Sequence, residues 1–208
     1  IRESIQNPKK QYLVLVPEQF TMQTQKELVR MHPRKGILNI DVLSFDRLAH
    51  RVFEETGGEY RKILEDTGKN MILRRLAEEK KGELTLLGGN LRKLGYISEV
   101  KSLLSEFVQY RITPEDLTQM MERNQDNPQL YYKLKDMKVI YESFQEYLKE
   151  EYLTSEQLLD VLEQTVEQSA AVRDSVIVLD GYTGFTPVQM KLLGRLMTLA
   201  EEVYITLT

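Results

Sequence analysis

The segment Tyr12-Leu13-Val14-Leu15-Val16 is a continuous apolar run that ends at Pro17. Such a run, rich in β-branched residues, is typical of a strand buried on both faces of a sheet. Proline suits the first turn of a helix, so we expect a helix over residues 18–31. A second run of this kind, Val176-Ile177-Val178-Leu179, ends in Asp180. The two runs predict a sheet that uses both ends of the sequence.

Strand and helix patterns alternate after the first run. Residues 37–43 are a second strand candidate, and Ser44 is suited to cap the next helix. Apolar residues in that helix recur at i, i+3, i+4, i+7 and i+8 as one stripe, and Gly57-Gly58 ends it. The order strand, helix, strand, helix over residues 11–57 predicts a parallel α/β sheet.

The middle of the chain, from about residue 60 to 171, has helical periodicity instead. Thr113 and Thr154 each begin a capping-box pattern, which predicts the start of a helix. The α/β pattern then returns, with another capping box at Thr186 and a closing strand at residues 203–208.

These patterns predict two domains. Residues 1–57 and 172–208 form an α/β sheet domain, and residues 58–171 form an all-helical subdomain inserted into it. The chain begins with Ile1 rather than Met, so we also expect it to be a piece of a longer protein.

Composition limits the chemistry available. The 208 residues are 41% hydrophobic and 29% charged, which is ordinary for a globular protein, and no apolar window is long enough for a membrane span. The sequence has no cysteine, which excludes thiolate zinc and iron–sulfur ligation within it. Of the two histidines, His32 and His50, we expect His50 to be a partly exposed surface residue, and no Ser–His–Asp set can be built.

Charge is unevenly distributed along the helical segment. Residues 60–111 carry 11 basic and 7 acidic side chains, whereas residues 112–170 carry 5 and 13. A field of this kind can steer a polyanion toward one face. The alternative interpretation is two solvated helical faces of opposite bias.

Asp180 is the side chain with the most specific chemical pattern. An apolar strand that ends in Asp is the Walker B form of P-loop nucleotidases, where the carboxylate holds Mg²⁺ at the carboxyl edge of the sheet. The alternative is a strand-end Asp that starts a turn. The next residue is Gly181, which supplies no second carboxylate to position an attacking water.

The phosphate-binding loop of such enzymes is missing. The nearest match, Thr67-Gly68-Lys69-Asn70, has Ile63 in place of the first glycine and lies in the helical segment. We therefore expect it to be the first turn of a helix. Five tyrosines at helical spacing can stack on bases or pack in a core, and packing is favoured: Tyr131, Tyr132, Tyr141, Tyr147 and Tyr152.

Three segments resemble UvrD/Rep-type superfamily 1 DNA helicases. Residues 43–51, Leu-Ser-Phe-Asp-Arg-Leu-Ala-His-Arg, resemble the family's Thr-Phe-His-x-Leu-Ala-x-Arg segment, with Asp46 in place of the usual His. Residues 141–148, running on to 158–159, are similar to the helix pair before its Walker B strand. Residues 179–189 take the place of its Asp-Glu-x-Gln-Asp-x-x-x-x-Gln, and the matching positions are Asp180 and Gln189.

Where these segments differ from the helicase motifs, they resemble one branch of the superfamily, the N-terminal region of the AddB (RexB) subunits of AddAB helicase–nucleases. The strings that carry this likeness are Pro17-Glu18-Gln19-Phe20-Thr21, Val42-Leu43-Ser44-Phe45 and Gly184-Phe185-Thr186-Pro187. The resemblance implies a P-loop-type (RecA-like) parallel sheet domain that lacks its P-loop strand and carries an inserted helical subdomain.

The resemblance also implies a function in the bacterial cytoplasm. The family processes DNA double-strand ends for recombinational repair as a heterodimer with an AddA-type helicase–nuclease partner. ATP and Mg²⁺ are expected only in the full-length protein, and the family's iron–sulfur cluster and nuclease lie outside these residues. Asp180 and Gln189 would be a degenerate nucleotide and Mg²⁺ site.

On this likeness we expect Gln19, Thr21, Ser44 and Arg47 to contact the backbone of single-stranded DNA, and such contacts should weaken steeply with salt. Two other hypotheses stay open. One is an active superfamily 1 motor domain, against which Gly181 argues. The other is a helical scaffold whose acidic segment docks a partner protein.

Overall fold

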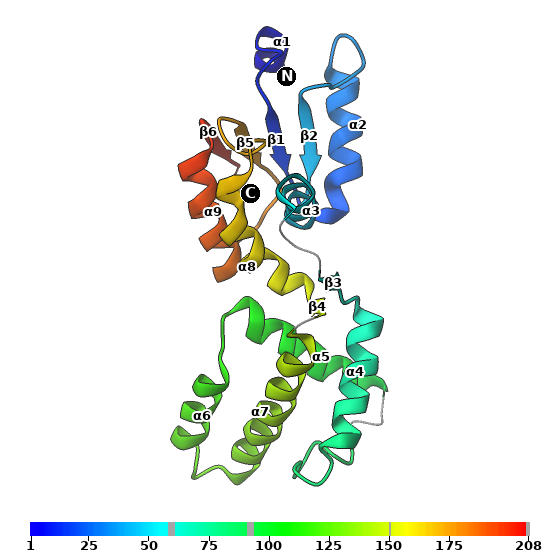
Figure 1. The fold of residues 1–208 in the computed structure, drawn as a ribbon, viewed down its shortest axis with the longest axis vertical. Helices are drawn as coiled ribbons and strands as arrows, with labels where there is room; N and C mark the ends of the chain where they lie inside the picture. The colour runs from blue at the N-terminus through cyan, green and yellow to red at the C-terminus, as the bar shows by residue number, and fades with distance from the viewer. Residues whose placement is uncertain (58–60, 91–93, 150, 207–208) are drawn as a thin grey trace. The chain divides into compact units, whose positions relative to one another are not determined.

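The computed structural model describes residues 1–57, 61–90, 94–149 and 151–206. The chain divides into two compact units (Figure 1). Residues 1–60 and 158–208 form an α/β unit, and residues 61–157 form a helical unit. This division assigns residues 158–171 to the α/β unit.

One wholly parallel sheet forms the centre of the α/β unit. Its strands lie in the order β2-β1-β5-β6, with the bounds Tyr12–Leu15 (β1), Ile40–Leu43 (β2), Val176–Leu179 (β5) and Glu202–Ile205 (β6). Tyr12 is opposite Ile40 on one side and Val176 on the other. The pairing of β1 with β5 confirms the prediction that the two distant apolar runs join in one sheet.

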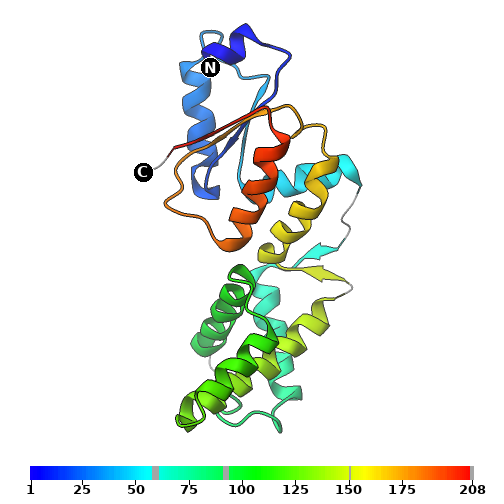
Figure 2. The same ribbon diagram turned by 90° about the vertical axis from the view of Figure 1, so that its left-hand side faces the viewer.

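Helices cover both faces of this sheet. Figure 2 shows α2 on one face and α9 on the other, because the connections from β1 and β5 lead to opposite sides of the sheet. The helical segments of this unit are α1 (Arg2–Gln6), a 3₁₀ turn (Glu18–Phe20), α2 (Thr21–Met31), α3 (Phe45–Thr56), α8 (Ser155–Thr165, of which residues 155–157 belong to the helical unit), a 3₁₀ turn (Val166–Gln168) and α9 (Pro187–Leu199).

The predicted helix boundaries are largely confirmed. Ser44 caps α3, and Gly57 ends it in a left-handed conformation with φ 65°. The predicted helix over residues 18–31 begins with a 3₁₀ turn, and the predicted strand at residues 37–43 begins only at Ile40.

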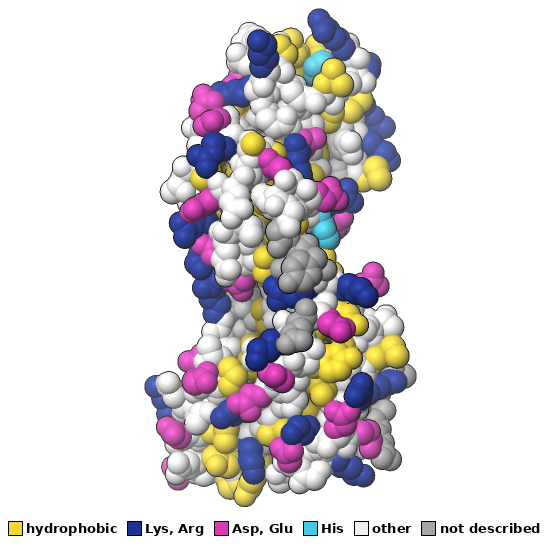
Figure 3. Space-filling view, viewed as in Figure 1, with side chains coloured by type: hydrophobic (Ala, Val, Ile, Leu, Met, Phe, Trp, Pro, Cys, Tyr) yellow, Lys and Arg dark blue, Asp and Glu magenta, His cyan; other side chains and the backbone are white. Residues whose placement is uncertain are grey.

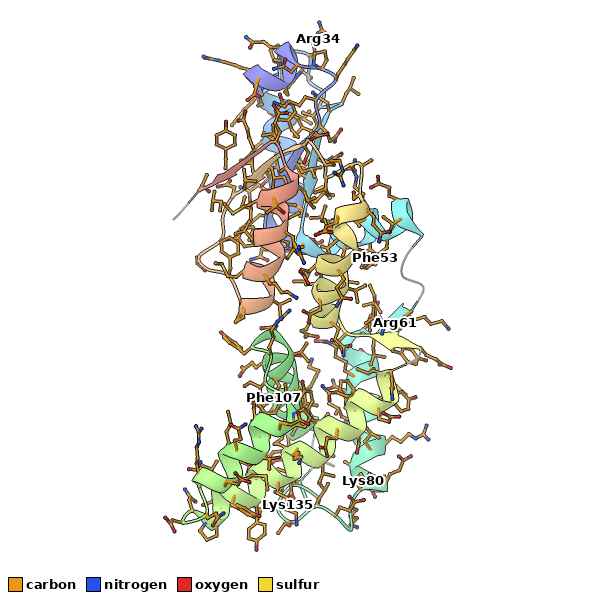
Figure 4. All side chains as sticks on the ribbon, turned by 60° about the vertical axis from the view of Figure 1, so that its left-hand side comes forward. Arg34, Phe53, Arg61, Lys80, Phe107 and Lys135 are labelled. Atoms are coloured by element: carbon orange, nitrogen blue, oxygen red, sulfur yellow. The ribbon has the colours of Figure 1, made fainter. Side chains whose placement is uncertain are left out.

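The helical unit contains α4 (Asp66–Glu79), α5 (Leu94–Gln109), α6 (Pro114–Arg123) and α7 (Pro128–Leu148). Their buried apolar side chains form one cluster, which includes Phe107 (Figure 4). The Phe107 ring lies edge-on to Tyr141, at 5.5 Å between centroids. Two-residue strands, Lys62–Ile63 (β3) and Tyr152–Leu153 (β4), pair in parallel. The sequence pattern missed them because two residues are too few to show a period.

The tyrosines of α7 divide between core and surface. Tyr141 is buried and donates its hydroxyl to the Ile112 carbonyl at 3.1 Å, as the packing interpretation predicts. Tyr132 and Tyr147 are exposed. None of the described helices combines the length and apolar character needed to cross a membrane.

Candidate functional site at the carboxyl edge of the sheet

The loops that follow β1 and β5 meet at one edge of the sheet. The chain leaves β1 toward β2 on one side and leaves β5 toward β6 on the other. A parallel sheet binds its ligands where the strand order reverses in this way, at the carboxyl ends of the two strands. Residues 17–21 and 180–186 occupy this position, which we call the carboxyl edge.

Asp180 lies at this edge, directly after β5. Its side chain is exposed, and its carboxylate accepts a hydrogen bond from the Thr206 hydroxyl. The Gln189 side chain hydrogen-bonds to Thr186 rather than to Asp180. Its side-chain oxygen accepts from the Thr186 backbone N–H at 3.0 Å, and its own N–H donates to the Thr186 hydroxyl at 3.3 Å. The Gln189 side chain therefore caps α9.

The backbone at Gly181 restricts what can stand beside Asp180. Gly181 has φ 75°, a left-handed conformation that L side chains adopt only with strain. A Cβ there would lie at ordinary contact distance, 3.7 Å from Pro17 Cδ and 3.8 Å from Phe20 Cδ2, so the backbone angle alone disfavours a side chain. A second carboxylate at this position would therefore carry the strain of a left-handed backbone.

The four residues predicted to contact DNA all lie near this edge, but their side chains differ in availability. Thr21 is buried and donates its hydroxyl to the Glu18 carbonyl at 2.9 Å. Ser44 is buried and accepts from the Arg47 backbone N–H at 3.3 Å. Gln19 and Arg47 are exposed. The Arg47 guanidinium pairs with the Glu18 carboxylate at 3.0 Å.

An aromatic cluster, which the sequence analysis did not identify, lines the edge. The ring of Tyr182 lies 5.4 Å from Phe45 and 5.2 Å from Phe185, between centroids. The buried Tyr182 hydroxyl has no hydrogen-bond partner. Burial, and then the charges of Asp46 and Glu18, raise the pKa of this phenol well above its usual range. The aromatic residues in the Gly-rich loop after Asp180 were the feature of the sequence that could have predicted this cluster.

The charge of the edge is acidic. The residues flanking the strand ends include Glu18, Asp46 and Asp180, against the cation Arg47. Among the residues that the structure describes, no group of three or more His, Asp or Glu side chains could hold a metal ion. The net negative charge of the residues named favours ligand groups that donate hydrogen bonds over phosphates.

The segment Thr67–Asn70, which partly matches a phosphate-binding loop, forms the start of a helix, as predicted. Residues 67–70 lie in the first turns of α4. Lys69 is buried in the helical unit, where its ammonium contacts the Glu156 carboxylate at 3.1 Å. His50 is exposed on α3, as predicted.

Comparison with known proteins identifies the family. The family model described as "ADDB, N-terminal" matches residues 1–208. The chain belongs to the AddB N-terminal family. It is 51% identical, over its whole length, to the B subunit of the ATP-dependent helicase/deoxyribonuclease of Lachnoclostridium phytofermentans.

Other relatives carry the same description. The corresponding B subunit of Alkaliphilus metalliredigens is 36% identical over 94% of this chain, and that of Bacillus licheniformis is 35% identical over all of it. The chain spans 17–18% of the length of these relatives. It therefore corresponds to one AddB N-terminal region within a family of much longer polypeptides.

Proposed function

We propose that this region is the helicase-like, single-stranded-DNA-binding part of a helicase–nuclease that processes DNA double-strand ends for recombinational repair. The family membership and the relatives' description as helicase/deoxyribonuclease B subunits support this proposal. The proposed partner is an AddA-type chain, because the designation of the relatives as B subunits implies an A counterpart. The proposed setting is the bacterial cytoplasm.

We further propose that the α/β unit is a P-loop-type (RecA-like) sheet without its P-loop strand, into which the helical unit is inserted. The parallel order β2-β1-β5-β6 and the acidic residue after β5 support the first point. The second is supported by the chain order, since residues 61–157 fall between two segments of the α/β unit.

The described residues do not fit a working nucleotide site. Hydrolysis of a nucleoside triphosphate requires a phosphate cradle, a metal-holding carboxylate and a group that positions water. Asp180 is the one candidate carboxylate after β5, Gly181 follows it in a left-handed conformation, and Gln189 caps α9. In this proposal these residues carry out no ATP- or Mg²⁺-dependent step, and the active-motor hypothesis is not favoured.

The observation that carries the proposal is the aromatic lining of the switch point between β1 and β5. Phe20 is 43% exposed in the segment after β1, close to Gly181, and Tyr182 and Phe185 are half-buried in the loop after β5. Exposed aromatic rings stack on unpaired bases. Carboxylates such as Glu18 and Asp180 accept hydrogen bonds from base amino groups, so an acidic edge suits bases better than phosphates.

Phe20→Ala in the full-length protein tests the proposal. Loss of one base stack costs roughly 1–3 kcal/mol, so the Kd for a fluorescent single-stranded oligonucleotide should rise by about 5- to 150-fold. The matched control is Tyr110→Ala, which removes a 59% exposed aromatic side chain from the helical unit and should leave the Kd unchanged. Equal affinities of all three proteins would overturn the proposal.

A further inference from the structure

The opposite, amino-terminal edge of the same sheet carries a basic cluster. Residues 1–10 contain three basic side chains and one acidic one, and residues 30–36 contain three Lys or Arg and no Asp or Glu. Five of these six cations are exposed, and none of the five forms an ion pair with a carboxylate that the structure describes. We call them the amino-edge cations: Arg2, Lys9, Arg30, Arg34 and Lys35.

Lys10 differs from these five because it is already paired. Its ammonium contacts Glu201 at 2.9 Å and Glu3 at 3.7 Å. Glu3 and Glu201 thus pair with Lys10 rather than with the amino-edge cations, whose charges stay available to an external ligand.

Contacts within the unit hold the two basic segments together. The Asn39 side-chain N–H₂ donates at 3.0–3.3 Å to three carbonyls of the first segment, those of Ser4, Asn7 and Lys10. Ile1 and Ile37 pack against the same apolar cluster. Lys35 donates to the Arg30 carbonyl at 2.7 Å, which fixes the turn after α2. These contacts hold both basic segments at the amino-terminal edge of the sheet rather than leaving them as two independent tails.

The view in Figure 3 shows Lys and Arg side chains over α1 and over the turn after α2. Figure 4 labels Arg34 at this end of the unit. The exposed large apolar side chains of the two segments and of the following loop are Ile5, Met31 and Leu38. None of these is aromatic, so the two basic segments themselves supply no stacking platform of the kind that single-stranded nucleic acid uses.

We propose that the amino-edge cations bind the phosphate backbone of duplex DNA without reading its sequence. Lys and Arg neutralise phosphates and so position a protein on the duplex, while bases are read elsewhere. The sheet then offers two separate DNA contacts of opposite character: a basic amino edge for the duplex and the acidic, aromatic carboxyl edge for bases. This inference uses none of the residues that carry the single-strand proposal.

The test is the salt dependence of duplex binding by the full-length protein in its purified complex. The variant is Lys9→Gln/Arg30→Gln/Arg34→Gln, which leaves Lys35 in place because Lys35 has φ 54° and a hydrogen bond of its own. Each neutralised phosphate contributes about 0.9 to the slope of log K against log salt. The triple variant should therefore lower the magnitude of that slope by about 2–3 for a blunt, fluorescein-labelled duplex.

A charge-matched control separates local contact from net charge. Arg74→Gln/Lys133→Gln/Lys135→Gln removes three exposed cations from the helical unit and should leave the slope nearly unchanged. Equal slopes for wild type and the amino-edge variant, or equal losses in both variants, would overturn the inference. So would an unchanged duplex slope together with weaker association with the AddA-type chain, which would identify the surface as a protein interface. The Phe20→Ala test concerns single strands, so either proposal can fail alone.

Discussion

Charged side chains in the core of the helical unit and at the carboxyl edge of the sheet have opposite surroundings. Asp136 on α7 is 0% exposed, and its carboxylate accepts from the backbone N–H groups of Thr85, Leu86 and Leu87 at 2.6–3.0 Å. Lys69 on α4 is 3% exposed and contacts Glu156. At the carboxyl edge, Asp180 and the Glu18–Arg47 pair face solvent.

The difference separates structural charges from charges available to a ligand. A buried ion that loses its partner keeps the full cost of desolvation, so the charges of the helical unit are bound to the fold. An exposed pair is screened by water and contributes little to stability. Substitutions of these charged residues should therefore reduce stability strongly in the core of the helical unit and weakly at the edge.

The largest effect is expected from Glu156→Gln. The Lys69 ammonium would lose its nearest carboxylate and keep only Asp66, at 3.7 Å. Breaking a buried pair from one side costs about 3 kcal/mol or more, which should speed hydrogen–deuterium exchange in α4 more than 100-fold. The double variant Lys69→Met/Glu156→Leu removes both charges and should recover most of the protection. A double variant as unstable as the single one would show that lost packing, rather than an unpaired charge, causes the effect.

The same pair predicts a pH dependence. Burial acts to raise the pKa of the Glu156 carboxyl, but a hydrogen bond from Ser105 and the charge of Lys69 outweigh it, so the pKa lies below its ordinary value of 4.5. A lowered folded-state pKa gives stability that is present above pH 4.5 and is lost as the pH falls through the folded-state value. The difference in exchange between wild type and Glu156→Gln should shrink over that range, and a constant difference would contradict the assignment.

Asp136→Ala should have the next largest effect. It removes the acceptor of three backbone N–H groups, of which that of Leu87 is buried. Leaving a buried donor without a partner costs about 2 kcal/mol, visible as faster exchange in residues 82–90. Asp136→Asn keeps one acceptor oxygen and should lose less. Asp126→Ala, an exposed acidic position, is the control, and a loss there as large as that of Asp136→Ala would contradict this interpretation.

The sequence predicted the parts of this comparison that depend on local pattern. The two apolar runs, the Ser44 cap and the capping boxes at Thr113 and Thr186 are read from neighbouring residues, and the structure confirms them. The anchors of the helical unit could not be predicted, because Asp136 and its partners are about 50 residues apart. The left-handed backbone of Gly181 could not be predicted either, because the sequence shows that the residue is glycine but not which dihedral angle it adopts.

Gly181→Ala should have a moderate effect at the carboxyl edge. Its φ of 75° costs an L residue about 1–2 kcal/mol, so the free energy of urea unfolding should fall by about that amount. Gly184→Ala is the control in the same loop, because Gly184 has no positive φ and open space at its Cβ position. Gly181→Glu should be destabilised likewise and gain no DNA-stimulated ATPase. An increase in ATPase would revive the motor hypothesis.

The smallest effect on stability is expected from Arg47→Gln. The Arg47–Glu18 pair is more than half exposed on both sides, so its loss should change the free energy of unfolding by less than about 0.5 kcal/mol. The hydrogen bond from the Ser44 hydroxyl lowers the pKa of the Glu18 carboxyl more than any other single interaction does, so Glu18 stays ionised at neutral pH in the variant.

If Arg47 also contacts a phosphate of single-stranded DNA, its removal should lower the magnitude of the salt slope of binding by about 0.7. Arg51→Gln is a suitable control, because its guanidinium pairs with Asp41 and was not assigned to DNA. A salt slope equal to that of the wild type in Arg47→Gln would exclude Arg47 from the proposed site. A large loss of stability would show that Arg47 has a structural role, like the buried charges of the helical unit.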